Sequence, residues 1–137
     1  MDEPDSFFTC ASGGLGHGLP AAVGVALARP DRRVVGLLGD GSAMYSIQGL
    51  WTAAELGLPL VFIIINNGSY HGLVEFAHHF NLPEVPGTKL PHLDFCALAR
   101  GHGVDAQTVE RSVDLPAALR CAFAARRPVL LDVRITL

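Results

Sequence analysis

The sequence contains neither a long apolar run nor a cluster of basic residues. Its longest uninterrupted apolar stretch, residues 60–65, has six residues, whereas a helix needs about twenty to cross a bilayer. The formal net charge is −3 and the lysines and arginines are scattered, so the basic face typical of nucleic-acid binding is missing. The first five residues include acidic but no basic side chains, which is not typical of a secretory signal. We therefore expect a cytoplasmic protein whose partners include neither a membrane nor a nucleic acid.

Cysteine is also scarce. The three cysteines, Cys10, Cys96 and Cys121, are odd in number and widely spaced, so the sequence indicates neither a disulfide framework nor a zinc site. We expect free thiols, as in a reducing compartment.

Charged residues are few, at 17% of the chain, while half of the residues are hydrophobic. This composition argues against disorder, and 137 residues suffice for one domain with a sizeable core. The excess of apolar residues indicates that another domain or subunit covers part of the surface, and we expect a homo-oligomer.

Short apolar segments alternate along the chain with helix-like segments. Continuous apolar strands without polar alternation are typical of a parallel sheet that is covered on both faces. The pattern predicts a single α/β domain over residues 1–137, a doubly wound parallel sheet with helices on both faces. We expect strands at 33–38, 60–65, 104–109 and 129–135, helices at 19–28, 42–56, 95–100 and 115–125, and a proline-rich loop at 83–91. Ser42 and Asp114 are the expected N-caps of two helices, and Gly57 is an expected helix end.

Two polar clusters follow the first two predicted strands: Gly-Asp-Gly-Ser at 39–42 and Asn-Asn-Gly-Ser at 66–69. Ligands of open parallel sheets bind beyond the carboxyl ends of the strands, so the clusters meet if these strands are neighbours. Asp40, the Asn67 amide oxygen and the Ser69 backbone carbonyl, which a turn at Gly68 would aim inward, are hard oxygen donors. Such donors suit Mg²⁺ or Ca²⁺.

One carboxylate carries too little charge for a metal cage built from protein alone. Mg²⁺ usually takes one or two carboxylates and completes its octahedron with phosphate oxygens and water. The donor set therefore predicts a phosphorylated cofactor that the metal bridges to the protein. The backbone N–H groups of Gly41 and Ser42, at a helix N-terminus, would hold the phosphate, and neither Gly39 nor Gly41 has a side chain that would block its approach.

The two clusters together resemble the thiamine diphosphate motif, which begins with Gly-Asp-Gly and ends with a paired asparagine beyond the next strand. Here 67 − 40 = 27 residues separate Asp40 from Asn67. Nearly the whole chain is similar to the C-terminal diphosphate-binding domain of thiamine diphosphate-dependent enzymes, and most of all to the benzoylformate decarboxylases. This resemblance implies thiamine diphosphate and Mg²⁺ as cofactors, with Asp40, Asn67 and the Ser69 carbonyl as metal ligands.

The resemblance also implies roles outside the two clusters. Residues 10–16 are similar to the family's loop beneath the aminopyrimidine ring. The Gly13 carbonyl would accept from the 4′-amino group, and Leu15 would be the apolar wedge that bends the cofactor into a V shape. Tyr45 belongs to a segment that matches the family closely and is expected in the cofactor site. Phe76 falls where the family places a residue against the substrate.

Two histidines depart from the family's pattern. His17 stands where an apolar residue is expected, and His71 where a small one is expected, on the presumed substrate side. His71 could be an acid or base, since histidine titrates near neutral pH, or a surface or gate residue. These departures leave undecided whether the substrate is an aryl 2-oxo acid, but they do not change the expected cofactor. The pair His78-His79 is expected to be exposed and not a metal tract, because adjacent residues on a helix point apart.

The resemblance further implies parts that this chain does not supply. Family enzymes take a glutamate and polar catalytic residues from an N-terminal pyrimidine-binding domain of a neighbouring subunit. The candidate glutamates here do not match that motif. We therefore expect an inactive isolated chain that is a fragment of a longer 2-oxo acid decarboxylase, in preference to one subunit of a split enzyme. The unmatched glutamates are Glu55, Glu75, Glu84 and Glu110.

Three alternatives stay open at this stage. An acetolactate synthase-like enzyme or an oxalyl-CoA-type lyase would share the domain, and most of the substrate pocket that distinguishes them lies outside this chain. A module that binds the cofactor without turnover would keep the same metal ligands. A Rossmann-type dehydrogenase, which the glycine-rich stretch at 13–18 superficially suggests, is disfavoured because the acidic residue that follows it is Asp40 of Gly-Asp-Gly, which fits a metal better than a ribose.

Overall fold

A computed structural model describes residues 6–10, 12–83 and 85–136, so the acidic N-terminal residues and Glu84 lie outside the described part. The strands are β1 (Val34–Gly39), β2 (Leu60–Asn66), β3 (Asp105–Val109) and β4 (Val129–Arg134). The helices are α1 (Gly18–Ala28), α2 (Asp40–Met44), α3 (Gly49–Glu55), α4 (His71–His79), α5 (Phe95–Gly101) and α6 (Leu115–Ala124), with a 3₁₀ turn, η1, at Ser112–Asp114.

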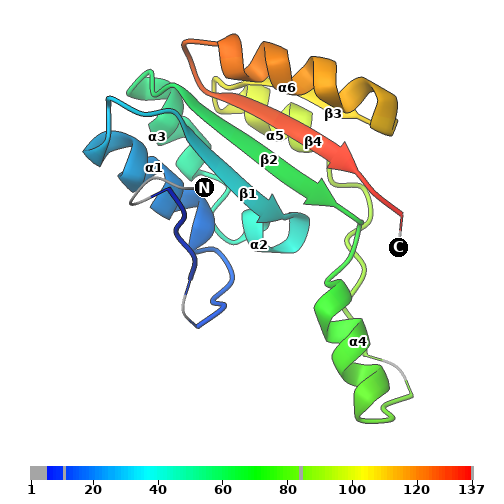
Figure 1. The fold of residues 1–137 in the computed structure, drawn as a ribbon. Helices are drawn as coiled ribbons and strands as arrows, with labels where there is room; N and C mark the ends of the chain where they lie inside the picture. The colour runs from blue at the N-terminus through cyan, green and yellow to red at the C-terminus, as the bar shows by residue number, and fades with distance from the viewer. Residues whose placement is uncertain (1–5, 11, 84, 137) are drawn as a thin grey trace.

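All four strands run parallel in one sheet of order β1-β2-β4-β3 (Figure 1). The first two strands pair directly, with Gly39 opposite Ile65 at their carboxyl ends. The predicted α/β fold with a parallel sheet is confirmed, and the two polar clusters follow neighbouring strands.

The core has one apolar layer on each face of the sheet. Side chains alternate along β2, so Leu60, Phe62 and Ile64 pack into the layer under α1, α3 and α5. Val61 lies in the other layer, which Ala118 and other residues of α6 cover. Helices therefore lie on both faces, as the continuous apolar strands predicted.

The second face is covered unevenly. Helix α6 packs over β3 and β4, while Val35 and Leu37 on β1 are 44% and 67% exposed. Within the described residues β1 pairs with β2 alone, so its other edge is open. A groove of about 670 Å³ runs along β1, and residues 6–10 contribute to its lining. This edge of the sheet is thus only partly covered by the described residues.

The single helix expected over residues 42–56 is wrong: the structure has α2 and α3 with a turn between them. Helix α2 starts at Asp40, so Gly39 is its N-cap and Ser42 lies inside it. The side chain of Ser42 accepts the Gly16 N–H at 3.2 Å, and Ser46 donates to the Gly16 carbonyl at 2.7 Å. The side chain of Ser42 is therefore engaged by the distant Gly16 and not by a helix N-terminus.

Asp114 is the N-cap residue of α6 by position, as expected, but its side chain makes no capping bond. It accepts instead from the Arg111 guanidinium at 2.8 and 3.0 Å. The expected helix end at Gly57 agrees with the structure, because α3 stops at Glu55.

Helix α4 was not among the predicted elements. It extends away from the sheet (Figure 1), and Ala77 is its only fully buried residue. Apolar residues do recur at helical spacing here, at Leu73, Phe76 or Ala77, and Phe80, so the pattern of an amphipathic helix was present in the sequence and was overlooked. The described residues of the segment 83–91 form a loop, as predicted, and Lys89 among them forms an isolated bridge with Ser69.

No helix among the described residues is long and apolar enough to cross a membrane. The three cysteines are free thiols, as expected.

Candidate functional site

The two polar clusters meet at the carboxyl edge of the sheet. Asp40 directly follows β1, and the 66–69 turn (Asn66 to Ser69) follows β2. The Gly68 N–H donates to Asp40 Oδ2 at 2.7 Å, so the clusters are in direct contact. The condition for a joint site, that β1 and β2 be neighbours, is therefore met.

Asp40 is buried, with a relative exposure of 3%, and its carboxylate accepts hydrogen bonds from backbone N–H groups. Oδ1 accepts the Gly41 N–H at 2.8 Å and Oδ2 accepts the Gly68 N–H. Because a carboxylate offers about four acceptor positions, it retains capacity for a cation. The Gly41 N–H, predicted to hold phosphate, donates to Asp40 in this structure.

The 66–69 turn presents the other two predicted metal ligands. Gly68 has φ +69°, the left-handed conformation that glycine adopts at least cost. Asn67 Oδ1 accepts from the Ser69 backbone N at 2.9 Å and from Ser69 Oγ at 3.2 Å. The Asn67 amide oxygen thus faces Ser69 within the turn.

A segment of the 83–91 loop holds the same turn from outside. Leu90 N donates to the Gly68 carbonyl at 2.8 Å, and Tyr70 N donates to the Thr88 carbonyl at 2.7 Å. Between these two bonds, the Ser69 carbonyl accepts no hydrogen bond from any described residue. It therefore stays available as a ligand.

The two glycines beside Asp40 serve different purposes. A Cβ atom on Gly39 would meet nothing within 4 Å, so this position leaves room for a ligand, as predicted. A Cβ atom on Gly41 would come within 2.2 Å of the Tyr70 ring. The missing side chain at Gly41 thus makes room for Tyr70.

Tyr70 forms part of a small aromatic pair at this edge. Its ring meets that of Tyr45 edge to face, with centroids 6.5 Å apart. Burial raises the pKa of the Tyr70 hydroxyl, and the neighbouring Tyr45 and Asp40 raise it further. Tyr70 therefore stays protonated at neutral pH, while Tyr45 is 61% exposed.

The loop that carries Gly13 and Leu15 is bonded to the same edge. Its Gly16 takes both serine bonds described above, so the loop is held against α2. Leu15 is 49% exposed, and Gly13 is also exposed. Ser46, which fixes this loop through Gly16, was not predicted as a site residue.

The two predicted substrate residues, His71 and Phe76, lie apart on α4. The His71 Nε2 atom is 3.4 Å from Glu75 Oε1, and both side chains are well exposed. Phe76 is 61% exposed and packs against Phe80 with ring centroids 4.6 Å apart. The contacts of both residues lie along their own helix, and His78 and His79 are exposed, as expected.

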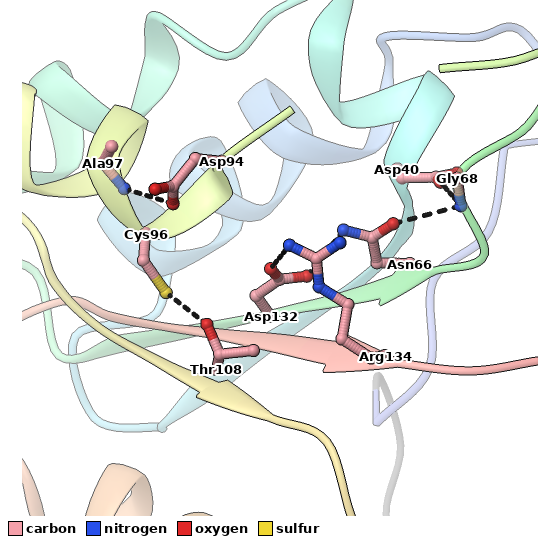
Figure 2. A network of polar contacts seen from close by, with 9 residues as sticks. All are labelled: Asp40, Asn66, Gly68, Asp94, Cys96, Ala97, Thr108, Asp132 and Arg134. Atoms are coloured by element: carbon pink, nitrogen blue, oxygen red, sulfur yellow. Dashed lines mark hydrogen bonds and ion pairs between the residues drawn. The ribbon is translucent and has the colours of Figure 1, made fainter. Parts of the chain in front are cut away.

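A polar network behind the turn was missed (Figure 2). The Asn66 side chain donates to Asp132 Oδ1 at 2.8 Å, and Arg134 Nη2 lies 2.9 Å from Asp132 Oδ2. Asp132 has a relative exposure of 0%. A single carboxylate inside an otherwise apolar strand was the signal that could have identified it.

The donor set fits a hard cation that is shared with a phosphate. Asp40 is its one carboxylate, and the described residues contain no group of three or more His, Cys, Asp or Glu side chains able to hold a metal. A site of this composition needs negative charge from a ligand to complete it.

Comparisons with known proteins agree with this chemistry. Residues 1–133 match the family model of the C-terminal TPP-binding domain of thiamine pyrophosphate enzymes. The chain is 53% identical over 133 residues to benzoylformate decarboxylase of Pseudomonas aeruginosa, covering 97% of this chain and 25% of that protein. It is 42% identical over 135 residues to a putative acetolactate synthase large subunit of Mycobacterium tuberculosis, with coverages of 93% and 26%.

Solved structures give the same result. A thiamine diphosphate-dependent 4-hydroxybenzoylformate decarboxylase of Rhodococcus jostii superposes with a TM-score of 0.90 and 50% identity, covering 93% of this chain and 24% of that one. Benzoylformate decarboxylase of Polynucleobacter necessarius gives a TM-score of 0.94 at 39% identity, with coverages of 98% and 26%. The chain thus spans about a quarter of the length of these relatives. Sequence match and fold together establish that the chain belongs to the thiamine pyrophosphate enzyme family, in which it is the C-terminal TPP-binding domain.

Proposed function

We propose that this chain binds the diphosphate of thiamine diphosphate through Mg²⁺, as the C-terminal domain of a non-oxidative 2-oxo acid decarboxylase of the benzoylformate decarboxylase type. The main observation in support of this proposal is the direct contact between the two polar clusters, in which the Gly68 N–H donates to Asp40 Oδ2 at 2.7 Å. In this proposal Asp40, Asn67 and the Ser69 carbonyl hold the metal. The retained capacity of the Asp40 carboxylate and the unbonded Ser69 carbonyl support these roles.

Further residues would receive the organic part of the cofactor. The open space beside Gly39 lets a diphosphate approach closely. The exposed Leu15 provides an apolar surface against which a ring can bend, and its loop is fixed through Gly16. When bound, thiamine diphosphate supplies the carbanion chemistry, while this chain supplies binding and orientation. The remaining proposed contacts are Gly13, Gly41, Ser42 and Tyr45.

The decarboxylase assignment is supported by the higher identity to a benzoylformate decarboxylase, 53%, than to a putative acetolactate synthase subunit, 42%. The second similarity favours an acetolactate synthase-like enzyme as the alternative. In either case the substrate is a 2-oxo acid, and His71 and Phe76 on α4 would border its pocket. A non-catalytic cofactor-binding module would have the same metal site.

The catalytic groups would come from the rest of a longer polypeptide, because the relatives are about four times as long. We propose that this part includes an N-terminal pyrimidine-binding domain and that the assembly is a cytoplasmic homo-oligomer. The open edge of β1 and its exposed Val35 and Leu37 support such a covering partner. An uncovered sheet edge invites pairing with other chains.

Calorimetric titration of thiamine diphosphate into the protein, with Mg²⁺ and then with EDTA, tests the cofactor role. We expect binding that requires the metal. Assays of the longer protein with benzoylformate and with pyruvate then separate the two enzyme classes: decarboxylation to an aldehyde supports the first, and joining of two pyruvates supports the second. Metal-independent binding, or none in the longer protein, would overturn the proposal.

A further inference from the structure

Asp132 is a buried carboxylate on β4, between the apolar residues Leu131 and Val133. Its relative exposure is 0%. A carboxylate removed from water is costly unless other groups compensate its charge. The groups that contact Asp132 therefore indicate what its burial achieves.

Two residues contact this carboxylate. Asn66 Nδ2 donates to Oδ1 at 2.8 Å. Arg134 Nη2 lies 2.9 Å from Oδ2, but this contact is an ion pair without hydrogen-bond alignment, so Oδ2 has no hydrogen-bond partner among the described residues. The Arg134 side chain is 43% exposed, and water screens much of its attraction. The well-aligned partner of Asp132 is Asn66.

This bond determines which way the Asn66 amide faces. An ionised carboxylate only accepts hydrogen bonds, so the NH₂ group of Asn66 must point to Asp132. The amide oxygen then points to the turn, where it accepts the Gly68 N–H at 3.1 Å. The same N–H donates to Asp40 Oδ2 (Figure 2).

We propose that Asp132 is a positioning residue for the metal site. By orienting the Asn66 amide, it keeps the Gly68 N–H on Asp40 and so sets the distance between Asp40 and Asn67. The metal part of this inference rests on the proposed function. The effect of Asp132 on the 66–69 turn requires neither a bound metal nor a bound cofactor. Experiment can therefore disprove the metal role while the effect on the turn stands.

The test compares Asp132→Leu and Asp132→Asn with a matched control, Thr108→Val. Thr108 lies opposite Asp132 on the neighbouring strand β3, and its hydroxyl contacts Cys96 at 3.2 Å instead of the turn. Hydrogen exchange of the Gly68 amide is followed by NMR without cofactor. Mg²⁺ is then titrated in the presence of thiamine diphosphate, and thermal melting reports whether each variant is folded.

We expect Asp132→Leu to speed exchange at Gly68 and to weaken Mg²⁺ binding about 10-fold. This is the lower end of the loss when a direct hydrogen-bond partner of a metal ligand is removed, because Asp132 acts through Asn66 and the Gly68 N–H. Asp132→Asn should fall in between, because an amide oxygen still accepts from Asn66 but the NH₂ group can take its place. Thr108→Val should leave both measurements unchanged even if it melts earlier.

A folded Asp132→Leu variant with normal Gly68 exchange and normal Mg²⁺ affinity would overturn the inference. Equal losses in Thr108→Val would also overturn it, since they would reflect general loosening of the sheet. If Gly68 exchange rises in Asp132→Leu while the unmodified protein binds neither Mg²⁺ nor cofactor, the metal role and the proposed function both fail. The orientation of the turn by Asp132 would then still stand.

Discussion

The 66–69 turn and helix α4 follow each other directly in the chain, yet they are held in opposite ways. Backbone or side-chain bonds from α2, from β4 through Asp132, and from the 83–91 loop all reach the turn. Helix α4 extends away from the sheet and buries only Ala77 fully. Its largest apolar side chains, Leu73 and Phe76, and that of the following Phe80 are more than half exposed.

The difference separates the two halves of the proposed site. Contacts within this chain suffice to arrange the residues proposed to hold the cofactor. The residues proposed to meet the substrate depend on surfaces that another part of the protein must provide. We therefore expect substitutions in the turn to change binding or stability in this chain alone, and substitutions on α4 to matter mainly in a complete enzyme.

The largest effect on cofactor binding is expected from removing the Asp40 carboxylate, which contacts the 66–69 turn. Asp40→Ala should weaken Mg²⁺-dependent binding of thiamine diphosphate by more than about 100-fold, since loss of an orienting group alone can cost that much. The measurement is calorimetric titration with Mg²⁺. Asp94→Ala is the control, because Asp94 caps α5 by accepting the Ala97 N–H at 2.8 Å. That variant should lose about 1 kcal/mol of stability and keep its affinity; equal affinities in both variants would contradict the metal role.

A smaller effect is expected at the contact between α2 and Tyr70. Gly41→Ala places a Cβ within 2.2 Å of the Tyr70 ring and should lower the free energy of unfolding by about 1–3 kcal/mol. Chemical denaturation measures this change. Gly39→Ala is the control, because a Cβ added at Gly39 would have no atom within 4 Å. It should change the free energy of unfolding by less than about 0.5 kcal/mol. Combining Gly41→Ala with Tyr70→Ala should recover part of the loss, and strictly additive losses would speak against the contact.

A matched pair of glycines compares the turn with α4 directly. Neither Gly68 nor Gly72 has an atom within 4 Å of an added Cβ, but only Gly68 has a positive φ, +69°. Gly68→Ala should destabilise the protein by about 1–2 kcal/mol because the left-handed conformation strains an L residue. Gly72→Ala, inside α4, should stabilise it by up to about 1 kcal/mol. Denaturation of both variants checks the signs, and the same sign for both would contradict the difference between turn and helix.

The smallest effect on stability is expected on α4. Phe76→Ala should change the free energy of unfolding by less than about 0.5 kcal/mol, because the ring is 61% exposed and surface substitutions are usually that small. In the longer protein the same change should raise KM for an aromatic 2-oxo acid. A marked loss of stability in this chain would show that α4 is held more firmly than its contacts indicate.

Much of the fold and the cofactor half of the site could be predicted from local patterns. The run at 60–65 is apolar and β-branched, which predicts a buried parallel strand whatever its neighbours. The polar clusters at 39–42 and 66–69 stand at strand ends, and Asp40, Asn67 and Ser69 are oxygen donors by their chemistry alone. The sequence by itself thus determined the fold class and the chemistry of the proposed metal site.

Only the tertiary structure decided which contacts arrange those donors. Ser42 is a good helix cap by its local sequence, but Gly16, 26 residues away, takes its side chain. Gly41 makes room for Tyr70, and Asp132 orients Asn66 from 66 positions away. Such pairings depend on how strands and loops come together in space, so no local pattern reveals them. For helix α4 the local pattern was present, with apolar residues at helical spacing, and what the tertiary structure alone decided is that this apolar face stays largely uncovered within the described residues.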